Sequence, residues 1–455
     1  MTPHDVSRRG FLGGSLAAAL GGLLPAPAAA QQPGNQAPPM AAGLDALKPS
    51  GPLDEAYWRK VRGQFNLVDG MTYMNTGTYG PSPRVVIDTN DRITRELSED
   101  PTNNYRAADR DIVRERVARF VGATADEIAL TRSTSEGMNI FTRGLDWKPG
   151  DEVLFNTHEH GGGIQPYTQM EARYGIKLVR IEIPSPVESV QQILQIYERA
   201  ITPRTRVIMV SHIPYVTGAI LPIKELADLA HAHKLLISVD GAHPLGMLDL
   251  NLAATGVDHY AAAGQKWLLA GSGTGVCYVK RSLQERLWPL MGYVDPKAWS
   301  EPDAASRGAR KYELGGQRHA PSVLGMGPAI ALQEAIGKQN VEARVRELGT
   351  RLRRGLADIP GVKLWTSNDP RFSAGITTFS VRAVPMENVV KAIYDYNHVW
   401  IRTMTTGNLN AVRASTHIYN SPEDVDRLLD AVAYVSKNAS RFMVPTTVQG
   451  PRFDD

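Results

Sequence analysis

Short apolar runs alternate with amphipathic stretches over about residues 86–285. The runs have the length and the Val, Ile and Leu content of buried strands: Glu152–Phe155, Leu178–Ile183, Val207–Ser211, Leu235–Val239 and Gly275–Val279. Stretches with helical spacing lie between them, among them Ser189–Ala200 and Ile223–His233. This alternation predicts an α/β domain built on a large, mainly parallel sheet.

The pattern changes beyond about Ala320. Long helices are predicted over Pro321–Lys338 and Val341–Ile359, followed by short strands at Ile376–Val381 and Val412–Ser415 and by a closing helix at Pro422–Ser436. We therefore predict a large domain over residues 86–330 and a small α+β domain over residues 331–445. An N-terminal segment, residues 52–85, goes with the small domain. No internal repeat is present.

Composition leaves this picture unchanged and excludes some functions. Hydrophobic residues make up 42% of the 455 residues and charged residues 21%, as in ordinary soluble enzymes. A formal net charge of +3 argues against nucleic acid and against a membrane surface as partners. The body of the chain has no apolar run of transmembrane length.

The first thirty residues predict an export signal. Residues 7–12 read Ser-Arg-Arg-Gly-Phe-Leu, a Gly- and Ala-rich apolar stretch follows, and Ala28–Ala30 offers a small-residue cleavage site. We expect a twin-arginine signal peptide over residues 1–30, cleaved after Ala30, and a flexible leader over residues 31–51. The twin-arginine export machinery is then a partner, and the periplasm is the destination. Because that route carries folded proteins, a cofactor can be inserted before export, and the single cysteine requires no disulfide.

The pairing of Asp240 with Lys266 carries most of the chemical information. The predicted strand Leu235–Val239 delivers Asp240 to its carboxyl end, and a second apolar run, His259–Ala263, delivers Lys266 to the same edge. An amine and a carboxylate arranged in this way suit pyridoxal phosphate. The amine forms a Schiff base, and the carboxylate keeps the pyridine nitrogen protonated. The alternative is that Asp240 and Lys266 are unrelated surface residues beside loops.

A predicted helix start before this pair suits the phosphate. Residues 131–137 follow the strand-like run 127–130, and Ser133 and Glu136 have the spacing of a capping box. The free N–H groups of such a helix attract anions, and the hydroxyls of Thr134 and Ser135 add donors. Most caps of this kind bind nothing, so this one is informative only because it precedes Asp240 and Lys266 in the expected order.

The histidines permit a rival interpretation. His160 suits stacking on a pyridine ring, but His158 and His160 together with Asp240 and His243 also suit zinc, as in a periplasmic metal-dependent hydrolase. A zinc site leaves Lys266 without a role.

The glycine-rich residues 271–275 lead into a strand and not a helix, which predicts a tight turn and not a nucleotide-binding loop. Cys277 in that strand is predicted to be an inert core residue.

These motifs resemble the class V aminotransferase family of fold-type I pyridoxal phosphate enzymes. The resemblance extends from about residue 73 to residue 420, and Asp-Gly-Ala-His at 240–243 with Gln-Lys-Trp at 265–267 is most similar to the isopenicillin N epimerase-like branch. It implies a large domain with a seven-stranded sheet, a small C-terminal domain, and a homodimer with active sites at the interface.

The resemblance also implies roles for individual residues. Lys266 would be the Schiff-base lysine and Asp240 the partner of the pyridine nitrogen. His160 would stack on the ring, and His243 would approach the phenolic oxygen. The remaining expected contacts are phosphate donors and substrate-binding residues: Thr134 and Ser135 for phosphate, and Arg413, Asn75 and Thr76 for substrate, with Arg413 clamping a carboxylate.

Several positions depart from the family pattern. Tyr215 stands where a small polar residue or Asn is usual, Gln265 where desulfurases have a phosphate-binding His, and Gln317 where a Thr of the partner subunit commonly binds phosphate. Ala263 likewise replaces a Ser. We retain Tyr215, Gln265 and Gln317 as candidate cofactor contacts. Desulfurases also carry a cysteine shortly before the carboxylate-binding arginine, and residues 403–410 contain none.

The expected activity is removal of the α-proton from a small amino substrate, with Lys266 as general base. Return of the proton decides between transamination and epimerisation, and loss of a β-substituent would make a C–S or β-lyase. Epimerisation needs a second acid, for which Tyr215 and His158 are possible. Because keto-acid and amino-donor pools are cytoplasmic, we expect tailoring of a metabolite in the periplasm. The zinc hydrolase and a catalytically silent binding protein are the remaining alternatives.

Overall fold

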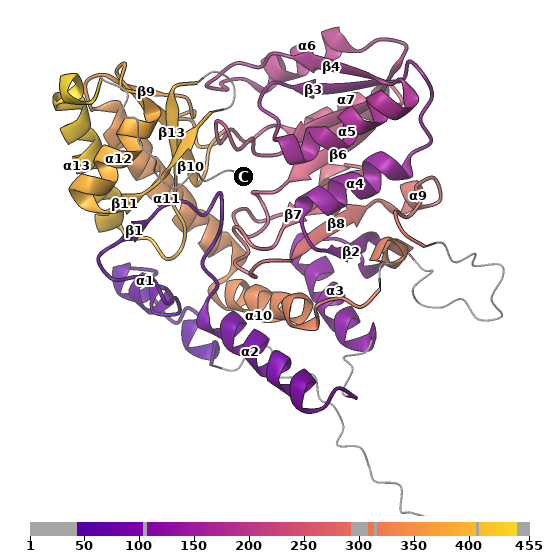
Figure 1. Cartoon of the computed structure of the whole chain (residues 1–455), viewed down its shortest axis with the longest axis horizontal. Coiled ribbons are helices and arrows are strands. Elements are labelled where there is room, and N and C mark those ends of the chain that lie inside the picture. The colour runs from indigo at the N-terminus through magenta and orange to yellow at the C-terminus, as the bar shows by residue number, and fades with distance from the viewer. Residues whose placement is uncertain (1–42, 103–106, 293–307, 314–315, 406–408, 444–455) are drawn as a thin grey trace, which may run out of the picture. The chain divides into compact units, whose positions relative to one another are not determined.

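A computed structural model describes residues 43–102, 107–292, 308–313, 316–405 and 409–443 (Figure 1). The predicted large sheet is present, with seven strands in the order β2-β8-β7-β6-β5-β3-β4. Strands β7, β6, β5, β3 and β4 are mutually parallel, and β8 runs antiparallel to β7 and β2. The bounds are β2 Ile128–Thr131, β3 Glu152–Asn156, β4 Lys177–Ile181, β5 Thr205–Ser211, β6 Leu236–Gly241, β7 His259–Ala263 and β8 Gly275–Val279.

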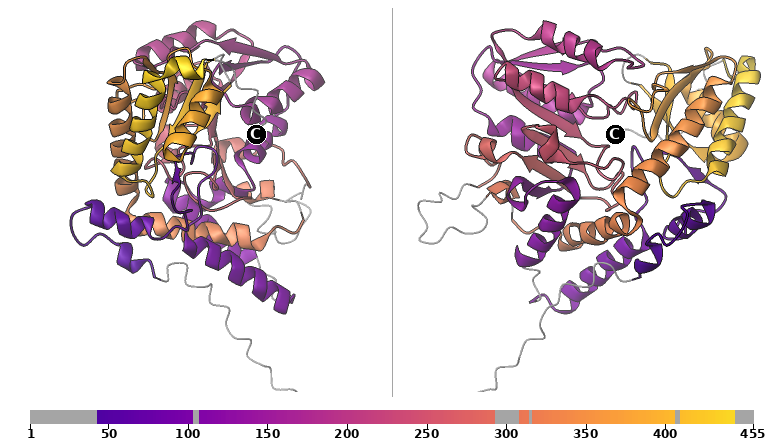
Figure 2. Two further views of the ribbon diagram at one scale, coloured as in Figure 1. Left: turned by 60° about the vertical axis from the view of Figure 1, so that its left-hand side comes forward. Right: turned by 180° about the vertical axis from the view of Figure 1, so that it is seen from behind.

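Helices cover both faces of this sheet (Figure 2). One face packs against α4 (Thr134–Gly144), α5 (Gly161–Tyr174) and α9 (Arg281–Gln284). The other carries α2 (Arg84–Glu99), α3 (Ala107–Val121), α6 (Val190–Ala200), α7 (Ile223–Ala232), α8 (Leu252–Thr255) and α10 (Ala320–Ile336). Because both faces are buried, the strands read as continuous apolar runs without alternation.

The position of Asp240 follows from this layering. In β6, Ile237 and Val239 enter the core beneath α7 and α10. Side chains alternate along a strand, so Ser238 and Asp240 project from the opposite face, beneath α4 and α5. The carboxyl end of β6 therefore places Asp240 at the edge where α5 begins.

The small domain is an antiparallel sheet covered by helices. Its order is β12-β13-β10-β9, with β9 Val362–Leu364, β10 Ile376–Val381, β12 Arg402–Met404 and β13 Ala411–Ser415. Helices α11 (Lys338–Ala357), α12 (Met386–Asn397) and α13 (Pro422–Lys437) enclose its core. The N-terminal segment joins this domain through β1 (Thr72–Tyr73), which pairs in parallel with β11 (Val399–Trp400).

The packed chain begins earlier than the sequence predicts. The signal, the cleavage site at Ala30 and most of the expected leader lie outside the described residues. Within the expected leader, however, Leu44 and Leu47 are each 2% exposed, around a short 3₁₀ turn at Asp45–Leu47. They pack in one cluster with Trp58 of α1 (Glu55–Arg62). The prediction of a flexible leader as far as residue 51 is therefore wrong for residues 44–47, because their leucines have apolar partners.

No helix in the described part of the chain is both long enough and apolar enough to span a membrane.

Candidate active site

Asp240 and Lys266 meet at the carboxyl edge of two neighbouring parallel strands. Asp240 lies at the end of β6 and Lys266 in the turn after β7, and the two strands pair in register. Asp240 is only 5% exposed, and burial raises the pKa of its carboxyl. The backbone N–H of Ala242, which donates to Oδ1 at 3.0 Å, opposes this rise, as does the charge of Lys266. The predicted juxtaposition of acid and amine is thus present.

A second buried carboxyl, Glu159, lies beside Asp240 and was not identified from the sequence. Its Oε1 accepts a hydrogen bond from the Ser211 backbone N–H at 2.9 Å, and Ser211 is the register partner of Asp240. The hydroxyl of Ser211 and the side-chain amide of Asn156 also contact the Glu159 carboxyl. Burial, assisted by the charge of Asp240, raises the pKa of Glu159 to about 8. A carboxyl with this pKa is mostly protonated at pH 7, so burial and the neighbouring acid both favour the neutral form of Glu159.

His160 is held by the helix that it begins. It is the N-cap of α5, and its Nδ1 accepts the backbone N–H of Gly162 at 3.0 Å. That bond fixes the ring and leaves the proton on Nε2. The ring meets Tyr215 edge to face, with centroids 4.7 Å apart. Gly163, one turn into the helix, lies so close to Asp240 that a Cβ there would be 3.0 Å from Oδ2.

His243 is oriented by Trp267, the residue after Lys266. The indole Nε1–H of Trp267 donates to Nδ1 of His243 at 3.1 Å. Burial lowers the pKa of His243 well below its usual range, and the charges of Lys266 and Arg413 lower it further. A neutral His243 that accepts at Nδ1 carries its proton on Nε2, so it is a hydrogen-bond donor on that side.

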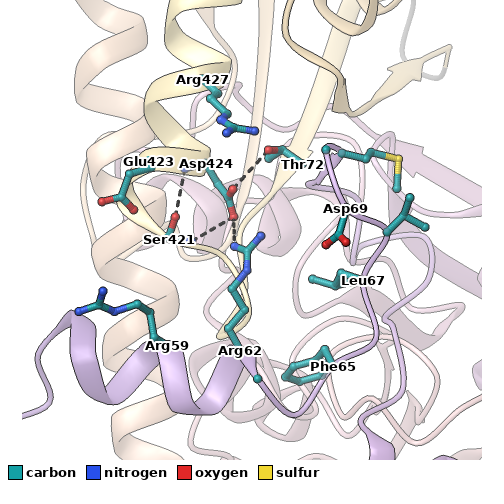
Figure 3. Close-up of a pocket in the computed structure, with 14 residues that line it drawn as sticks. Arg59, Arg62, Phe65, Leu67, Asp69, Thr72, Ser421, Glu423, Asp424 and Arg427 are labelled. Atoms are coloured by element: carbon teal, nitrogen blue, oxygen red, sulfur yellow. Dashed lines mark hydrogen bonds and ion pairs between the residues drawn. The ribbon is translucent and has the colours of Figure 1, made fainter.

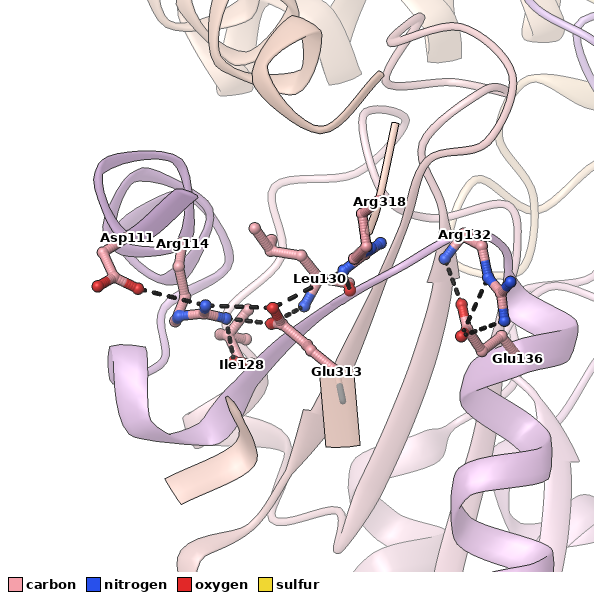
Figure 4. Close-up of polar contacts among 8 residues, drawn as sticks. All are labelled: Asp111, Arg114, Ile128, Leu130, Arg132, Glu136, Glu313 and Arg318. Carbon is pink, nitrogen blue, oxygen red and sulfur yellow. Dashed lines mark hydrogen bonds and ion pairs between the residues drawn. The ribbon is translucent and has the colours of Figure 1, made fainter. Parts of the chain in front are cut away.

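The helix start that the sequence predicts before Lys266 is present as the start of α4. Ser133 is the N-cap, and its Oγ accepts the Glu136 backbone N–H at 3.1 Å. Glu136 does not complete the expected capping box, because its carboxylate reaches the backbone N–H and the guanidinium of Arg132 instead (Figure 4). Thr134 is buried and Ser135 is exposed, with the Ser135 hydroxyl beside Gly162 of α5. The first turns of α4 and α5 therefore lie next to each other.

Arg413 lies in β13, across from the large sheet. Its side chain is 1% exposed, and its Nη2 donates to Asn75 Oδ1 at 3.2 Å and to Thr78 Oγ1 at 3.0 Å. Gly77 lies between them in the chain and close to the guanidinium, because a Cβ there would lie 3.0 Å from Cζ of Arg413. Thr78 was not identified from the sequence. The hydroxyl of Thr76 contacts that of Tyr419 in the core, so the proposed contact of Thr76 with substrate stays a prediction.

Of the other predicted cofactor contacts, Tyr215 is buried beside Arg413 and His160, whereas Gln317 lies at the surface. Tyr215 is 8% exposed and lies between two other predicted site residues, because its carbonyl accepts from Arg413 Nη1 at 3.3 Å while its ring packs on His160. Gln317 is exposed, and its neighbour Arg318 donates to the carbonyl of Leu130 in β2. Figure 4 shows that contact beside Glu313, which accepts from the Leu130 N–H at 2.6 Å. The role of Gln317 stays a prediction.

The rival zinc site lacks its ligands. Among the described residues, no three or more His, Cys, Asp or Glu side chains are placed to hold a metal ion. His158 is buried, and burial lowers its pKa to about 4.

The predictions for the glycine-rich residues 271–275 and for Cys277 are confirmed. Gly271 and Gly273 have positive φ in a turn closed by a hydrogen bond from Thr274 Oγ1 to the Gly271 carbonyl, and burial raises the pKa of the Cys277 thiol.

A separate hollow of about 590 Å³ lies between α1 and α13 (Figure 3). Arg59, Arg62 and Arg427 line it together with Asp69, Glu423 and Asp424. Arg62 is paired with Asp424 at 2.6 Å, and Asp424 also caps α13 with Ser421. None of the predicted site residues lines this hollow, and its ion pair ties α1 to α13.

The residues of the pocket fit pyridoxal phosphate. Thr134 Oγ1 and Gln265 Oε1 are buried and have no hydrogen-bond partner among the described residues. Unpaired buried polar atoms are costly, so their presence beside a helix N-terminus is explained by a group that hydrogen-bonds there. Gly275 lies close to the Ser133 backbone, which brings the turn containing Gln265 next to the start of α4. Thr134, Ser135 and Gln265 would hold the phosphate, Asp240 the ring nitrogen and Lys266 the aldehyde carbon.

Comparison with known proteins agrees with this geometry. The family model "Aminotransferase class-V" matches residues 88–428. Isopenicillin N epimerase of Streptomyces clavuligerus is 28% identical over 389 residues, covering 83% of this chain and 98% of the epimerase. A probable cysteine desulfurase of Methanothermobacter thermautotrophicus is 26% identical over 394 residues, covering 81% and 95%.

Two solved structures show the same fold. The cystine C–S lyase C-DES, in complex with cysteine persulfide, has a TM-score of 0.73 at 24% identity and covers 81% of this chain and 99% of its own. An apo cysteine desulfurase from Thermococcus onnurineus has a TM-score of 0.72 at 22% identity and covers 84% and 98%. The fold is therefore that of the fold-type I pyridoxal phosphate enzymes. Together with the match over most of its length, this establishes that the chain belongs to the class V aminotransferase family, whose cofactor is pyridoxal phosphate.

Proposed function

We propose that this chain is an exported pyridoxal phosphate enzyme that removes the α-proton of an amino acid or small peptide-like amine, acting as a transaminase or as an isopenicillin N epimerase-like enzyme. One observation carries the proposal. Asp240 and Lys266 converge on one sheet edge, and the buried guanidinium of Arg413 lies across from them. That set supplies an anchor, a counter-charge and a carboxylate clamp.

The cofactor, when bound, supplies an electron sink for the charge that the departing proton leaves behind. Asp240 strengthens that sink because its negative charge favours a protonated ring nitrogen. Lys266 would hold the cofactor, and its amine, when free, would be the base for the α-proton. Arg413 fixes the substrate carboxylate through a two-pronged contact, which orients the α-carbon towards Lys266. His160 and His243 arrive pre-oriented by Gly162 and Trp267.

The second proton donor separates the two outcomes. A base alone supports transamination, whereas epimerisation needs an acid on the face away from Lys266. Tyr215 is the better candidate because it packs on His160 and its backbone contacts Arg413. His158 is buried, with its pKa lowered to about 4, and is thus a poor acid at neutral pH. The similarity to isopenicillin N epimerase supports the epimerase-like alternative.

A C–S or β-lyase is the second candidate function. Cysteine desulfurases are among the relatives of this chain. A persulfide relay through a protein thiol is not part of this proposal, because residues 403–410 contain no cysteine and Cys277 is buried in β8.

The periplasmic role rests on the signal-like residues 7–30. Export of a folded, cofactor-loaded protein through the twin-arginine machinery explains how a cytoplasmic cofactor reaches that compartment. We also propose a homodimer with active sites at its interface.

Borohydride reduction followed by peptide mapping tests the proposal. A pyridoxyl adduct on Lys266 is expected, and an adduct on another lysine, or none, contradicts it. Incubation with amino compounds in heavy water then identifies the reaction. Exchange of the α-proton with a keto-acid product indicates transamination, racemised substrate without keto acid indicates epimerisation, and release of the β-substituent indicates a lyase. An adduct without exchange on any substrate indicates a silent binding protein.

A further inference from the structure

A second arginine stands directly opposite Arg413. In the antiparallel pair β12–β13, Arg402 is the register partner of Arg413. Residues opposite each other in such a pair project from the same face, with Cβ atoms about 5 Å apart, and like charges in that position are destabilising. A fold that keeps two cations there gains when an anion binds between them.

Both guanidinium groups converge on one hydroxyl. Arg402 Nη1 donates to Thr78 Oγ1 at 3.1 Å, and Arg413 Nη2 donates to the same oxygen at 3.0 Å. The Thr78 hydroxyl itself donates to Asn75 Oδ1 at 3.0 Å. One threonine therefore aligns both side chains from the loop after β1.

Both charges also act on His243, a predicted cofactor contact. Arg413 and Arg402 are each among the cations that lower the pKa of the buried His243. They differ in depth, because Arg413 is 1% exposed while Arg402 is only partly buried. The inner guanidinium lies where an α-carboxylate is expected, and the outer one lies nearer to solvent.

We propose that Arg402 and Arg413 form a double-guanidinium subsite that selects substrates with two carboxylates. Arg413 takes the carboxylate on the α-carbon, and Arg402 takes a second carboxylate farther along the molecule. The substrate class is an amino dicarboxylate, or an amino-acid-derived compound with a second carboxylate. This inference rests on the proposed function, since it assigns the substrate of the same pocket.

The test compares two ligand classes on the full-length, cofactor-loaded protein. Calorimetry gives dissociation constants for L-glutamate and L-2-aminoadipate and for their monocarboxylate counterparts L-norvaline and L-norleucine. We expect Arg402→Gln to weaken the dicarboxylates by about 10- to 100-fold, as for loss of one charge-assisted hydrogen-bonded contact, and the monocarboxylates by less than about twofold. Arg371→Gln, which removes an exposed arginine paired with Asp369, is the control that leaves both classes unchanged.

Two results overturn the inference. Equal weakening of both classes means that the two arginines share one carboxylate, and no change in either class means that Arg402 is structural. Arg402→Lys keeps the charge and loses the fork, so it is expected to retain part of the preference and serves if the Gln variant does not fold. Failure of the proposed function appears separately, as the absence of a reducible adduct on Lys266, whereas calorimetry reports the carboxylate preference with or without the cofactor.

Discussion

Glu159 and Asp240 are two buried carboxyl groups that are linked through Ser211. The Ser211 N–H donates to Glu159, and Ser211 is the register partner of Asp240 on the next strand. Two buried carboxyls so close together do not both ionise readily. Protonation of Glu159 therefore removes one of the two negative charges from this buried pair.

This pair predicts a pH-dependent stability of the apoprotein. The pKa of Glu159 is raised from 4.5 to about 8 by burial and by Asp240, and Tyr167 and Tyr197 are the other titratable groups that face it. A raised carboxyl pKa gives stability that is fully present below pH 4.5 and is lost as the pH rises towards 8. Through this group, the free energy of unfolding falls by up to about 1.4 kcal/mol for each pH unit between these two values.

Glu159→Gln is expected to remove that slope, because glutamine mimics the protonated acid and keeps both contacts with Ser211. Urea unfolding at several pH values between 5 and 8 measures it, with Glu188→Gln, at an exposed position, as control. A slope that persists in Glu159→Gln would show that another group carries it.

Lys266→Ala is expected to reduce α-proton exchange by about 10²- to 10⁴-fold, the usual contribution of a positioned base. The variant also loses the covalent anchor, so borohydride should leave no pyridoxyl peptide. Exchange in heavy water, followed by mass spectrometry, measures the first effect. Lys224→Ala, which removes an exposed lysine paired with Asp228, is the matched control. Unchanged exchange in Lys266→Ala would reject its role as base.

The close approach of Gly80 to the Lys266 turn gives another prediction. The Gly80 N–H donates to the Gln265 carbonyl at 2.9 Å, and a Cβ at residue 80 would lie 2.0 Å from the Lys266 carbonyl oxygen. Gly80→Ala must therefore displace the turn, at a cost of about 1–3 kcal/mol in unfolding free energy. Apoprotein stability and cofactor affinity should fall together. Gly51→Ala, with open space around its Cβ, should change neither, and a stable, fully loaded Gly80→Ala protein would contradict the packing argument.

The chain order of apolar runs was sufficient to predict most of the fold and the core of the site. Strands β7 and β8 begin and end where the sequence predicts, because each is short, apolar and bounded by polar or glycine residues. Asp240 and Lys266 were predictable for the same reason, since each follows such a run. The leucines at 44 and 47 were missed because a leader rich in Pro, Ala and Gln gives no periodic signal.

Contacts between distant segments were not predictable. Arg402 gains meaning only from its register with Arg413, and Thr78 only from a loop far away in sequence that reaches both. Glu159 lies between two histidines that suggested stacking or zinc, and only the packing of α5 on β5 and β6 shows that it is a buried partner of Asp240. Sequence patterns locate strand ends, whereas pairing across domains depends on tertiary packing.

Export is expected to depend on the arginine pair. Replacing both residues, as in Arg8→Lys with Arg9→Lys, keeps the charge but removes the guanidinium groups that define a twin-arginine signal. The protein should then remain in the cytoplasm at its full length, as cell fractionation and N-terminal sequencing of the two pools measure. Arg371→Lys makes the same change at an exposed position and should leave export intact. Periplasmic accumulation of the double variant would contradict the twin-arginine assignment.

Tyr215→Phe separates the two proposed reactions. The phenyl ring keeps its packing on His160, whereas the hydroxyl that would protonate the α-carbon is lost. If the enzyme is an epimerase, racemisation should fall by about 10²-fold or more, while exchange with retained configuration continues through Lys266. Chiral chromatography of substrate recovered from heavy water distinguishes the two, and Tyr174→Phe, at an exposed tyrosine, is the control. Racemisation that survives Tyr215→Phe would move the second acid elsewhere, whereas unchanged keto-acid formation without racemisation in the parent protein would identify a transaminase, for which the Tyr215 hydroxyl is dispensable.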